Sequence, residues 1–220
     1  MSEVTLIDVR KEVFEENDQC ASEIRASLQK YHTRMINLMG SPGCGKTTFL
    51  LRTIKELKDK WKIAVIEGDL DSLVDSKKII AADATAVQIN TGGACHLEAT
   101  VVQRALNSFP VEDYDLTFVE NIGNLVCPAE FDIGESLKVM ILSVPEGDDK
   151  ILKYPLMFSV ADVLIVTKTD YLPDEGFSLE ALKSRAAVLN PSMKIIELSA
   201  RTGDGFNKWV DFLNDFMESN

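Results

Sequence analysis

Segment 40–47, GSPGCGKT, has the residue types and the spacing of a phosphate-binding loop. Gly40, Gly45, Lys46 and Thr47 satisfy the pattern G-x-x-x-x-G-K-[ST], between an apolar run and an amphipathic one. In such a loop, backbone N–H groups and a helix N-terminus face phosphate oxygens, the lysine reaches the outer phosphates, and the hydroxyl ligates Mg²⁺. A chance glycine-rich turn would lack this context. The sequence predicts a nucleotide site whose phosphate contacts also include Gly43, Cys44 and Thr48.

A second motif, TKTD at residues 167–170, indicates which base the nucleotide carries. The Asp170 carboxylate can accept hydrogen bonds from guanine N1–H and the exocyclic amine, a pair of donors that adenine lacks. A surface lysine and aspartate at a strand end are the alternative interpretation. The segment LSAR at 198–201 follows in the order typical of GTPases, where its backbone contacts the guanine carbonyl oxygen. The motifs favour GTP or GDP over ATP, with base contacts from Lys168, Asp170, Ser199, Ala200 and Arg201.

Two carboxylates stand at the ends of apolar runs, Asp69 in VIEGD and Glu120 in FVENIG. As hard oxygen ligands, both are expected to hold Mg²⁺ with Thr47, directly or through water. The pair Glu120 and Gly123 resembles the D-x-x-G element of GTPases, whose glycine N–H senses the γ-phosphate. No histidine or glutamine stands beside it, so slow intrinsic hydrolysis is expected, completed by a partner or by dimerisation. The expected hydrolytic residues are Lys46, Thr47, Asp69, Asp75 and Glu120.

Cys95, His96 and Cys127 form a second chemical group, in segments that follow predicted strands. Thiolate and imidazole are the donors that Ni²⁺ and Zn²⁺ select. Because Cys95 lies near the start of a predicted helix, its thiol is expected to ionise readily. Buried cysteines and a histidine helix cap are the alternative. Three ligands fall short of a closed four-coordinate site, so water or a second chain would complete it.

The elements that must position these residues alternate along the chain. Apolar runs without alternation indicate strands that are covered on both faces, and amphipathic segments between them indicate helices. The pattern predicts a three-layer α/β fold of the P-loop NTPase type around a mostly parallel sheet. Strands are expected at 35–39, 62–67, 85–90, 115–120, 138–144, 162–168 and 193–198, and helices at 46–60, 95–109, 177–189 and 205–217.

The first 33 residues differ from this alternation and are expected to form an amphipathic helix extension before a P-loop domain at 34–220. Its apolar residues have an approximately helical spacing within a charged background. The helix packs either on its own domain, the commoner arrangement, or on a second copy. The apolar positions are Leu6, Val9, Val13, Ile24 and Leu28.

Composition limits the possible partners. With 45% hydrophobic and 26% charged residues the chain is typical of globular proteins, and its net charge of −12 disfavours nonspecific binding to nucleic acid or anionic membranes. No apolar stretch approaches the ~20 residues of a membrane span, so a cytoplasmic protein is expected. The four cysteines do not suggest a disulfide framework. Cys44 is expected to contribute only its amide, its accessible thiol being open to oxidation.

Taken together, several segments resemble the HypB family of hydrogenase nickel-incorporation GTPases, which is related to the urease accessory GTPase UreG. They are GSPGCGKT, EGD, INTGGACHLEA, FVENIGNLVCPAEFDIGE, VPEGDDKILKYPLMF and VTKTD. The resemblance implies a GTPase with bound Mg²⁺ that forms a homodimer in its GTP-bound state. It also implies a Ni²⁺ or Zn²⁺ site at the dimer interface from Cys95, His96 and Cys127. The implied partners are a HypA-type accessory protein and the precursor of the hydrogenase large subunit.

The chain departs from the family pattern in three places. It has no N-terminal cysteine-rich motif or histidine tract, it reads GGACH without the usual lysine, and Glu98 replaces a more usual aspartate. The first departure argues against high-affinity nickel storage, and the other two remove no implied ligand. Two other functions stay open: a GTPase for urease or a cobalamin-dependent enzyme, and a metal-binding adaptor with a vestigial nucleotide site.

Overall fold

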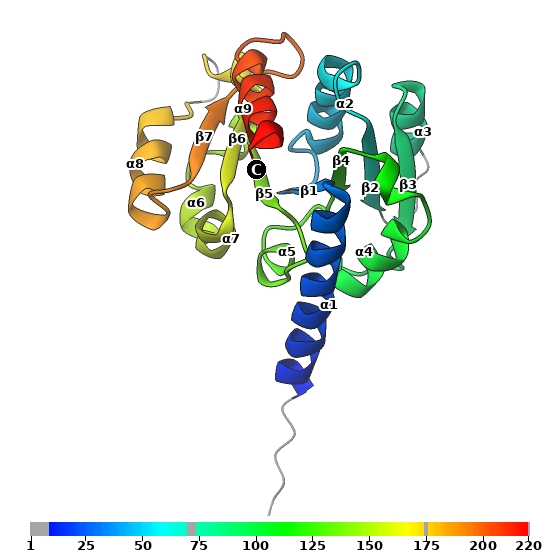
Figure 1. Cartoon of the computed structure of the whole chain (residues 1–220). Coiled ribbons are helices and arrows are strands. Elements are labelled where there is room, and N and C mark those ends of the chain that lie inside the picture. Colours follow the sequence, from blue (N-terminus) through cyan, green and yellow to red (C-terminus); the bar gives the residue numbers. More distant parts are fainter. Residues whose placement is uncertain (1–8, 70–73, 174–175, 220) are drawn as a thin grey trace, which may run out of the picture.

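A seven-stranded parallel sheet forms the centre of the protein, seen in a computed structural model that describes residues 9–69, 74–173 and 176–219 (Figure 1). The strand order is β3-β2-β4-β1-β5-β6-β7, and every neighbouring pair is parallel. The P-loop α/β fold predicted from the alternating pattern is confirmed. The strands are β1 (Arg34–Gly40), β2 (Ile63–Asp69), β3 (Thr85–Asn90), β4 (Leu116–Glu120), β5 (Leu137–Ser143), β6 (Val163–Thr167) and β7 (Lys194–Glu197).

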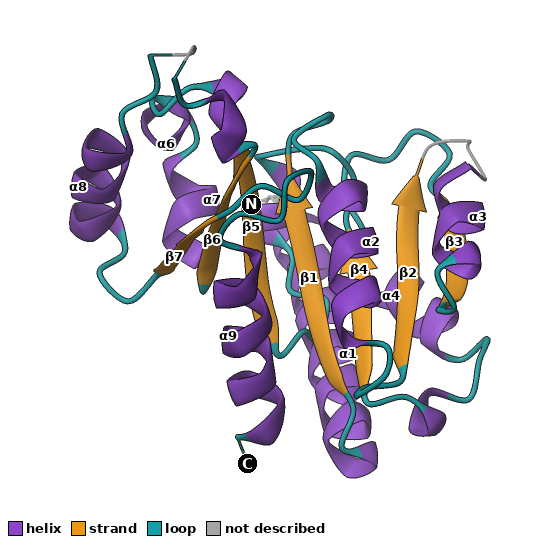
Figure 2. Ribbon diagram, turned by 90° about the horizontal axis from the view of Figure 1, so that it is seen from above, coloured by secondary structure: helices purple, strands orange, loops and turns teal. Residues whose placement is uncertain are grey.

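Helices cover both faces of the sheet, as apolar strands without alternation require (Figure 2). Ile36 and Leu38 of β1 face a core shared with α2 and α9, whereas Met35 and Met39 face the opposite side. The α-helices are α1 (Val9–Tyr31), α2 (Lys46–Leu57), α3 (Val74–Ala81), α4 (Ala99–Leu106), α5 (Cys127–Glu130), α6 (Lys150–Lys153), α7 (Pro155–Val160), α8 (Leu179–Leu189) and α9 (Phe206–Glu218). Single 3-10 turns are η1 (Val111–Asp113), η2 (Val144–Glu146) and η3 (Thr169–Tyr171).

Two sequence predictions about helices need correction. The helix expected from residue 95 begins only at Ala99, because Glu98 is extended at φ −93° and ψ 157°. Cys95 and His96 therefore lie in a loop. The short helices α3, α5, α6 and α7 were not predicted, since four to eight residues carry too little periodicity to be distinguished from a loop.

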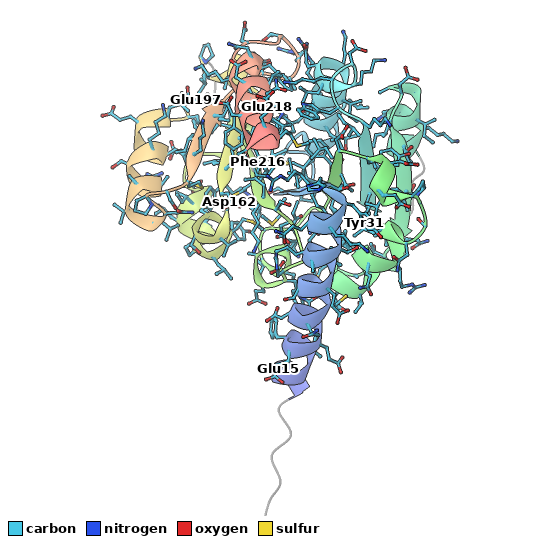
Figure 3. The ribbon with its side chains drawn as sticks, viewed as in Figure 1. Glu15, Tyr31, Asp162, Glu197, Phe216 and Glu218 are labelled. Carbon is cyan, nitrogen blue, oxygen red and sulfur yellow. The ribbon has the colours of Figure 1, made fainter. Side chains whose placement is uncertain are left out.

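The N-terminal helix α1 packs on its own domain, chiefly against α4, which confirms the commoner of the two predicted arrangements. Ile24 and Leu28 are buried as expected, but Val13 is 40% exposed. Its exposure has a simple cause: the first turns of α1, marked by Glu15, project past the sheet (Figure 3). Leu6 and the side chain of Val9 lie outside the described part. No helix of the described part is long and apolar enough to cross a membrane.

Candidate nucleotide and metal sites

The phosphate-binding loop connects β1 to α2 at the carboxyl edge of the sheet. Gly43 and Gly45 adopt φ of 73° and 103°, in the left-handed region that favours glycine. At Gly40 a Cβ atom would lie 2.6 Å from the Ile141 carbonyl oxygen, so only glycine fits beside β5. The Lys46 Nζ donates to the carbonyls of Gly40 and Ser41 at 3.3 and 3.2 Å. The Lys46 side chain is thus held against the backbone of the phosphate-binding loop.

A cavity of about 540 Å³ lies over this loop. The start of α2 opens onto it, which brings a helix N-terminus and backbone amides to a single space, the arrangement that binds phosphate anions. The cavity joins the phosphate loop to the ends of β2 and β4 and to α3. Its lining includes Gly43, Gly45, Lys46, Thr47, Thr48, Glu67, Lys78, Glu120 and Gly123.

Two of the three predicted Mg²⁺ ligands, Thr47 and Glu120, lie in contact in the structure. The Thr47 hydroxyl donates to Glu120 Oε1 at 2.8 Å, although the two residues are far apart in the sequence. A hydroxyl beside a carboxylate in a phosphate cavity suits a hard cation. Asp69 ends β2 and Asp75 lies in the first turn of α3, but their side chains lie outside the described part.

Gly123 lies directly against the phosphate loop. A Cβ atom at this position would be 2.9 Å from the backbone nitrogen of Pro42. The glycine therefore allows the segment after β4 to touch the loop that faces phosphate. This close approach puts the Gly123 backbone beside the phosphate loop, in the lining of the cavity.

One acidic residue of the cavity was missed in the sequence analysis. Glu67 is buried, lines the same cavity and stands opposite Glu120 in the register of β2 and β4. Its Oε2 accepts a hydrogen bond of 2.5 Å from the Ser76 hydroxyl of α3. The period of two in a strand could have found it, because Glu67 and Asp69 must share one face.

The predicted base-recognition residues gather around a second cavity of about 190 Å³. Asp170 accepts hydrogen bonds from the Ser199 hydroxyl at 2.6 Å and from the Arg201 guanidinium. These contacts, the Ser199 bond first, hold the Asp170 pKa below its usual value, so the carboxylate stays an acceptor. The Lys168 Nζ donates to the Gly43 carbonyl at 2.8 Å, which joins base site to phosphate loop. Cys44, Gly45, Thr48, Thr167, Tyr171 and Ala200 complete the lining.

Replacing Asp170 by asparagine should change the base preference. We expect Asp170→Asn to weaken GTP binding by about 10²-fold or more, because an amide cannot accept both guanine donors. Xanthosine triphosphate should gain affinity, since its 2-carbonyl can accept from the new amide. Titration calorimetry with GTP, ATP and xanthosine triphosphate measures both effects, with Asp211→Asn on the exposed side of α9 as the control. An unchanged ratio of GTP to ATP affinity would remove Asp170 from the base site.

Cys44 is not the accessible thiol that the sequence analysis expected. Its side chain is 0% exposed within the core under α2, and burial raises its pKa to about 11. Its carbonyl accepts from the Thr167 hydroxyl at 2.9 Å, and its amide donates to the Ser41 carbonyl at 3.3 Å. The prediction of an accessible thiol was wrong, because the Cys44 side chain packs into the core beneath α2.

Cys95, His96 and Cys127 come together although 32 residues separate the two cysteines. The Sγ atoms lie 3.0 Å apart, Cys95 Sγ lies 3.5 Å from His96 Nδ1, and all three ligand atoms fall within 4.8 Å. His96 Nε2 is buried without a hydrogen-bond partner in the described part, with Glu98 Oε1 at 3.7 Å. Two thiols with an imidazole nitrogen beside them fit a borderline cation. Cys95 is exposed, which leaves the cluster open on one side.

The expectation that the Cys95 thiol ionises readily needs correction. The hydrogen bond with Cys127, followed by burial, raises the Cys95 pKa, so the free thiol does not ionise readily. The predicted help from a helix N-terminus is absent because α4 begins four residues later. Burial lowers the pKa of His96 against the opposing charges of Glu98 and Glu130, so its imidazole is neutral and able to bind metal.

Asn124 lies between the two sites and touches both. Its backbone forms a β-bridge with Gly40 at the start of the phosphate loop. Its side-chain Nδ2 donates to the Cys95 carbonyl at 3.1 Å, and its Oδ1 accepts from the Val126 amide at 2.9 Å, next to Cys127. One residue therefore links the phosphate loop to both cysteine-bearing segments.

Comparison with known proteins identifies relatives along nearly the whole chain. Residues 34–197 match the family model described as CobW/HypB/UreG, nucleotide-binding domain. The hydrogenase maturation factor HypB of Azotobacter chroococcum mcd 1 is 45% identical over 213 residues, 97% of this chain and 70% of the relative.

Two solved structures share the fold closely. HypB from Archaeoglobus fulgidus has a TM-score of 0.87 at 38% identity, covering 93% of this chain and 100% of that one. HypB from Helicobacter pylori, solved in complex with nickel, has a TM-score of 0.87 at 36% identity, covering 92% and 95%.

Proposed function

Because the chain belongs to the HypB family of hydrogenase maturation factors, a GTPase family, we propose that it couples GTP binding and hydrolysis to the delivery of Ni²⁺ for [NiFe]-hydrogenase maturation. The nickel-bound relative from Helicobacter pylori supports Ni²⁺ as the cargo. Zn²⁺ is the alternative cargo, since thiolate and imidazole accept both ions.

The observation that carries this proposal is the position of Asn124 between the two sites. It bridges Gly40 and hydrogen-bonds the Cys95 carbonyl and the Val126 amide. A phosphate loop that moves on exchange of GTP for GDP would displace these segments with it. Metal affinity would then depend on the nucleotide.

The residues around the phosphates divide the work of hydrolysis. Lys46 neutralises charge on the outer phosphates, and the amides at the start of α2 orient them. Thr47 and Glu120, joined at 2.8 Å, would hold Mg²⁺ together with Asp69, and the ion would offset negative charge on the phosphates. Asp75 is a candidate switch carboxylate, and the Gly123 amide would sense the γ-phosphate. Among the described residues that line the cavity none is histidine or glutamine, which supports slow intrinsic hydrolysis.

A second copy of the chain would complete the metal site. Three ligands and an exposed Cys95 leave coordination positions that the same cluster of a partner copy can fill across a two-fold axis. We assign a HypA-type protein and the precursor of the hydrogenase large subunit as further partners, on the basis of the family. The cytoplasm is the compartment that suits four free thiols.

Sedimentation velocity tests the proposed switch. With GDP the protein should sediment as a monomer, and with a nonhydrolysable GTP analogue, Mg²⁺ and Ni²⁺ as a dimer with about one Ni²⁺ per pair of clusters. Asn124→Ala should keep both nucleotide affinities but lose most of the nucleotide dependence of Ni²⁺ affinity, with Asn107→Ala on the far end of α4 as the control. The same sedimentation coefficient under both conditions would contradict the proposal.

A further inference from the structure

Helix α1 contacts both segments that carry the proposed metal ligands, although it precedes the residues matched by the family model (Figure 1). One segment contains His96 and leads into α4. The other runs from Cys127 through α5 to Asp132. Neither the phosphate cavity nor the base cavity includes any residue of α1. Of the candidate sites, α1 therefore borders the segments of the metal site and lines neither of the two nucleotide cavities.

Asn17 makes the most specific of these contacts. Its side chain is 3% exposed, and both ends of its amide are used. Nδ2 donates to the Asp132 carbonyl at 2.8 Å. Oδ1 accepts at 2.9 Å from the backbone amide of Ala99, which is the first residue of α4. Asn17 thus ties together two segments that are not neighbours in the sequence.

An aromatic stack reinforces this connection. The ring of Phe14 in α1 lies 4.9 Å from that of Phe131, and the Phe131 ring lies 3.9 Å from the His96 imidazole, each pair nearly parallel. Phe131, the residue just after α5, therefore fixes the orientation of the His96 imidazole by stacking on it. Phe14 of α1 in turn packs on the Phe131 ring. Stacked ring pairs favour one ring orientation over others.

Two further contacts, one at Asp132 and one at Gly134, hold this segment on α1. The Arg25 guanidinium donates to both Asp132 carboxylate oxygens at 2.7 and 2.8 Å. At Gly134, with φ 83°, a Cβ atom would lie 2.7 Å from the Ala21 carbonyl oxygen, so the backbone touches α1 directly. The segment after Cys127 is thus held against α1 at several points.

We propose that α1 is part of the metal centre and that Asn17 is a positioning residue, which holds the His96 and Cys127 segments at the separation that one ion requires. Metal bonds of about 2.0–2.3 Å allow ligand atoms to be at most roughly 4.6 Å apart. In the structure the two Sγ atoms lie 3.0 Å apart and Cys95 Sγ lies 3.5 Å from His96 Nδ1, so these pairs fall within that limit, and a displacement of either segment that carries the ligand atoms beyond it breaks the site. The inference rests on the metal site proposed above.

Nickel binding by Asn17→Ala tests this role, with Gln29→Ala, which removes an exposed carboxamide from the same helix, as the control. Removing a partner that orients metal ligands typically costs 10- to 100-fold in affinity. We expect Asn17→Ala to raise the Ni²⁺ dissociation constant by about 10-fold or more and to reduce the thiolate-to-nickel charge-transfer absorption. The affinity for the GTP analogue should stay within about twofold, because α1 touches neither nucleotide cavity.

Three further outcomes separate this inference from the proposed function. If Cys127→Ala binds Ni²⁺ like the unaltered protein, the metal site itself is wrong. If Cys127→Ala loses Ni²⁺ while folded Asn17→Ala keeps both affinity and absorption, the role of Asn17 is wrong and the site stands. Should Asn17→Ala melt at a temperature too low for titration, Phe14→Leu decides: its absorption band must shift, and an unchanged spectrum would overturn the inference.

Discussion

Lys46→Ala is expected to abolish measurable GTP turnover while the protein still folds. The Lys46 ammonium lies over the phosphate loop, where its Nζ donates hydrogen bonds to the Gly40 and Ser41 carbonyls. Its loss removes a fixed positive charge where negative charge develops, which costs about 10²–10³-fold in kcat when a single donor of this kind is removed. Phosphate release under single-turnover conditions with Mg²⁺ measures the effect.

The matched control is Lys55→Ala, because Lys55 is an exposed lysine on the same helix α2. This variant should hydrolyse GTP at the normal rate. A metal-binding adaptor with a vestigial nucleotide site makes the opposite prediction: there, hydrogenase maturation in a cell lacking its own HypB would be restored equally by Lys46→Ala. Full turnover by Lys46→Ala, or no Mg²⁺-dependent hydrolysis by the unaltered protein at dimer-forming concentrations, would end the switch mechanism.

Cys127→Ala and Cys95→Ala should each lose Ni²⁺ and Zn²⁺ binding at the cluster. A structural zinc site with four ligands is worth roughly 10–16 kcal/mol, so one ligand accounts for several kcal/mol and its loss weakens binding by about 10²-fold or more. Equilibrium dialysis with and without a nonhydrolysable GTP analogue gives stoichiometry and affinity together.

Cys20→Ala provides the control for the loss of a thiol. Cys20 is buried in α1, outside the cluster, and its substitution should leave the number of bound ions unchanged. Unchanged stoichiometry in both Cys95→Ala and Cys127→Ala would show that the ion binds elsewhere. GTP hydrolysis with Mg²⁺ but without Ni²⁺ or Zn²⁺ should stay near normal in all three variants, since neither Cys95 nor Cys127 lines the phosphate cavity and Cys20 lies in α1.

A buried polar network accompanies these sites and was not foreseen. Asn121 Nδ2 donates to Asn37 Oδ1 at 3.1 Å, and Asn37 Nδ2 donates to Glu135 Oε1 at 3.3 Å. Burial raises the pKa of Glu135, partly offset by the Lys138 ammonium. The network runs from the end of β4, beside Glu120, across β1 to the segment that α1 holds. It gives the nucleotide site a second rigid connection to the metal segments.

The sequence alone determined the class of fold and the residue types at each site. Strand and helix periods predicted the parallel sheet, because strands buried on both faces must be continuously apolar. The phosphate loop and TKTD could be found because their chemistry depends on local spacing within one segment. The pairing of Cys95 and His96 with Cys127 came from similar reasoning about strand ends, supported by family resemblance.

Only the tertiary structure decided what depends on contacts between distant segments. It put Glu67 beside Glu120, turned the Cys44 thiol into the core, and began α4 late enough to leave Cys95 in a loop. It also joined Asn17 to Ala99 and Asp132, 82 and 115 residues away. Local sequence cannot specify such partners, since a buried amide finds its hydrogen bonds wherever packing brings polar groups together. The cluster of Cys95, His96 and Cys127 was therefore visible as a set of residue types in the sequence, whereas the contacts of α1 with its segments were visible only in the fold.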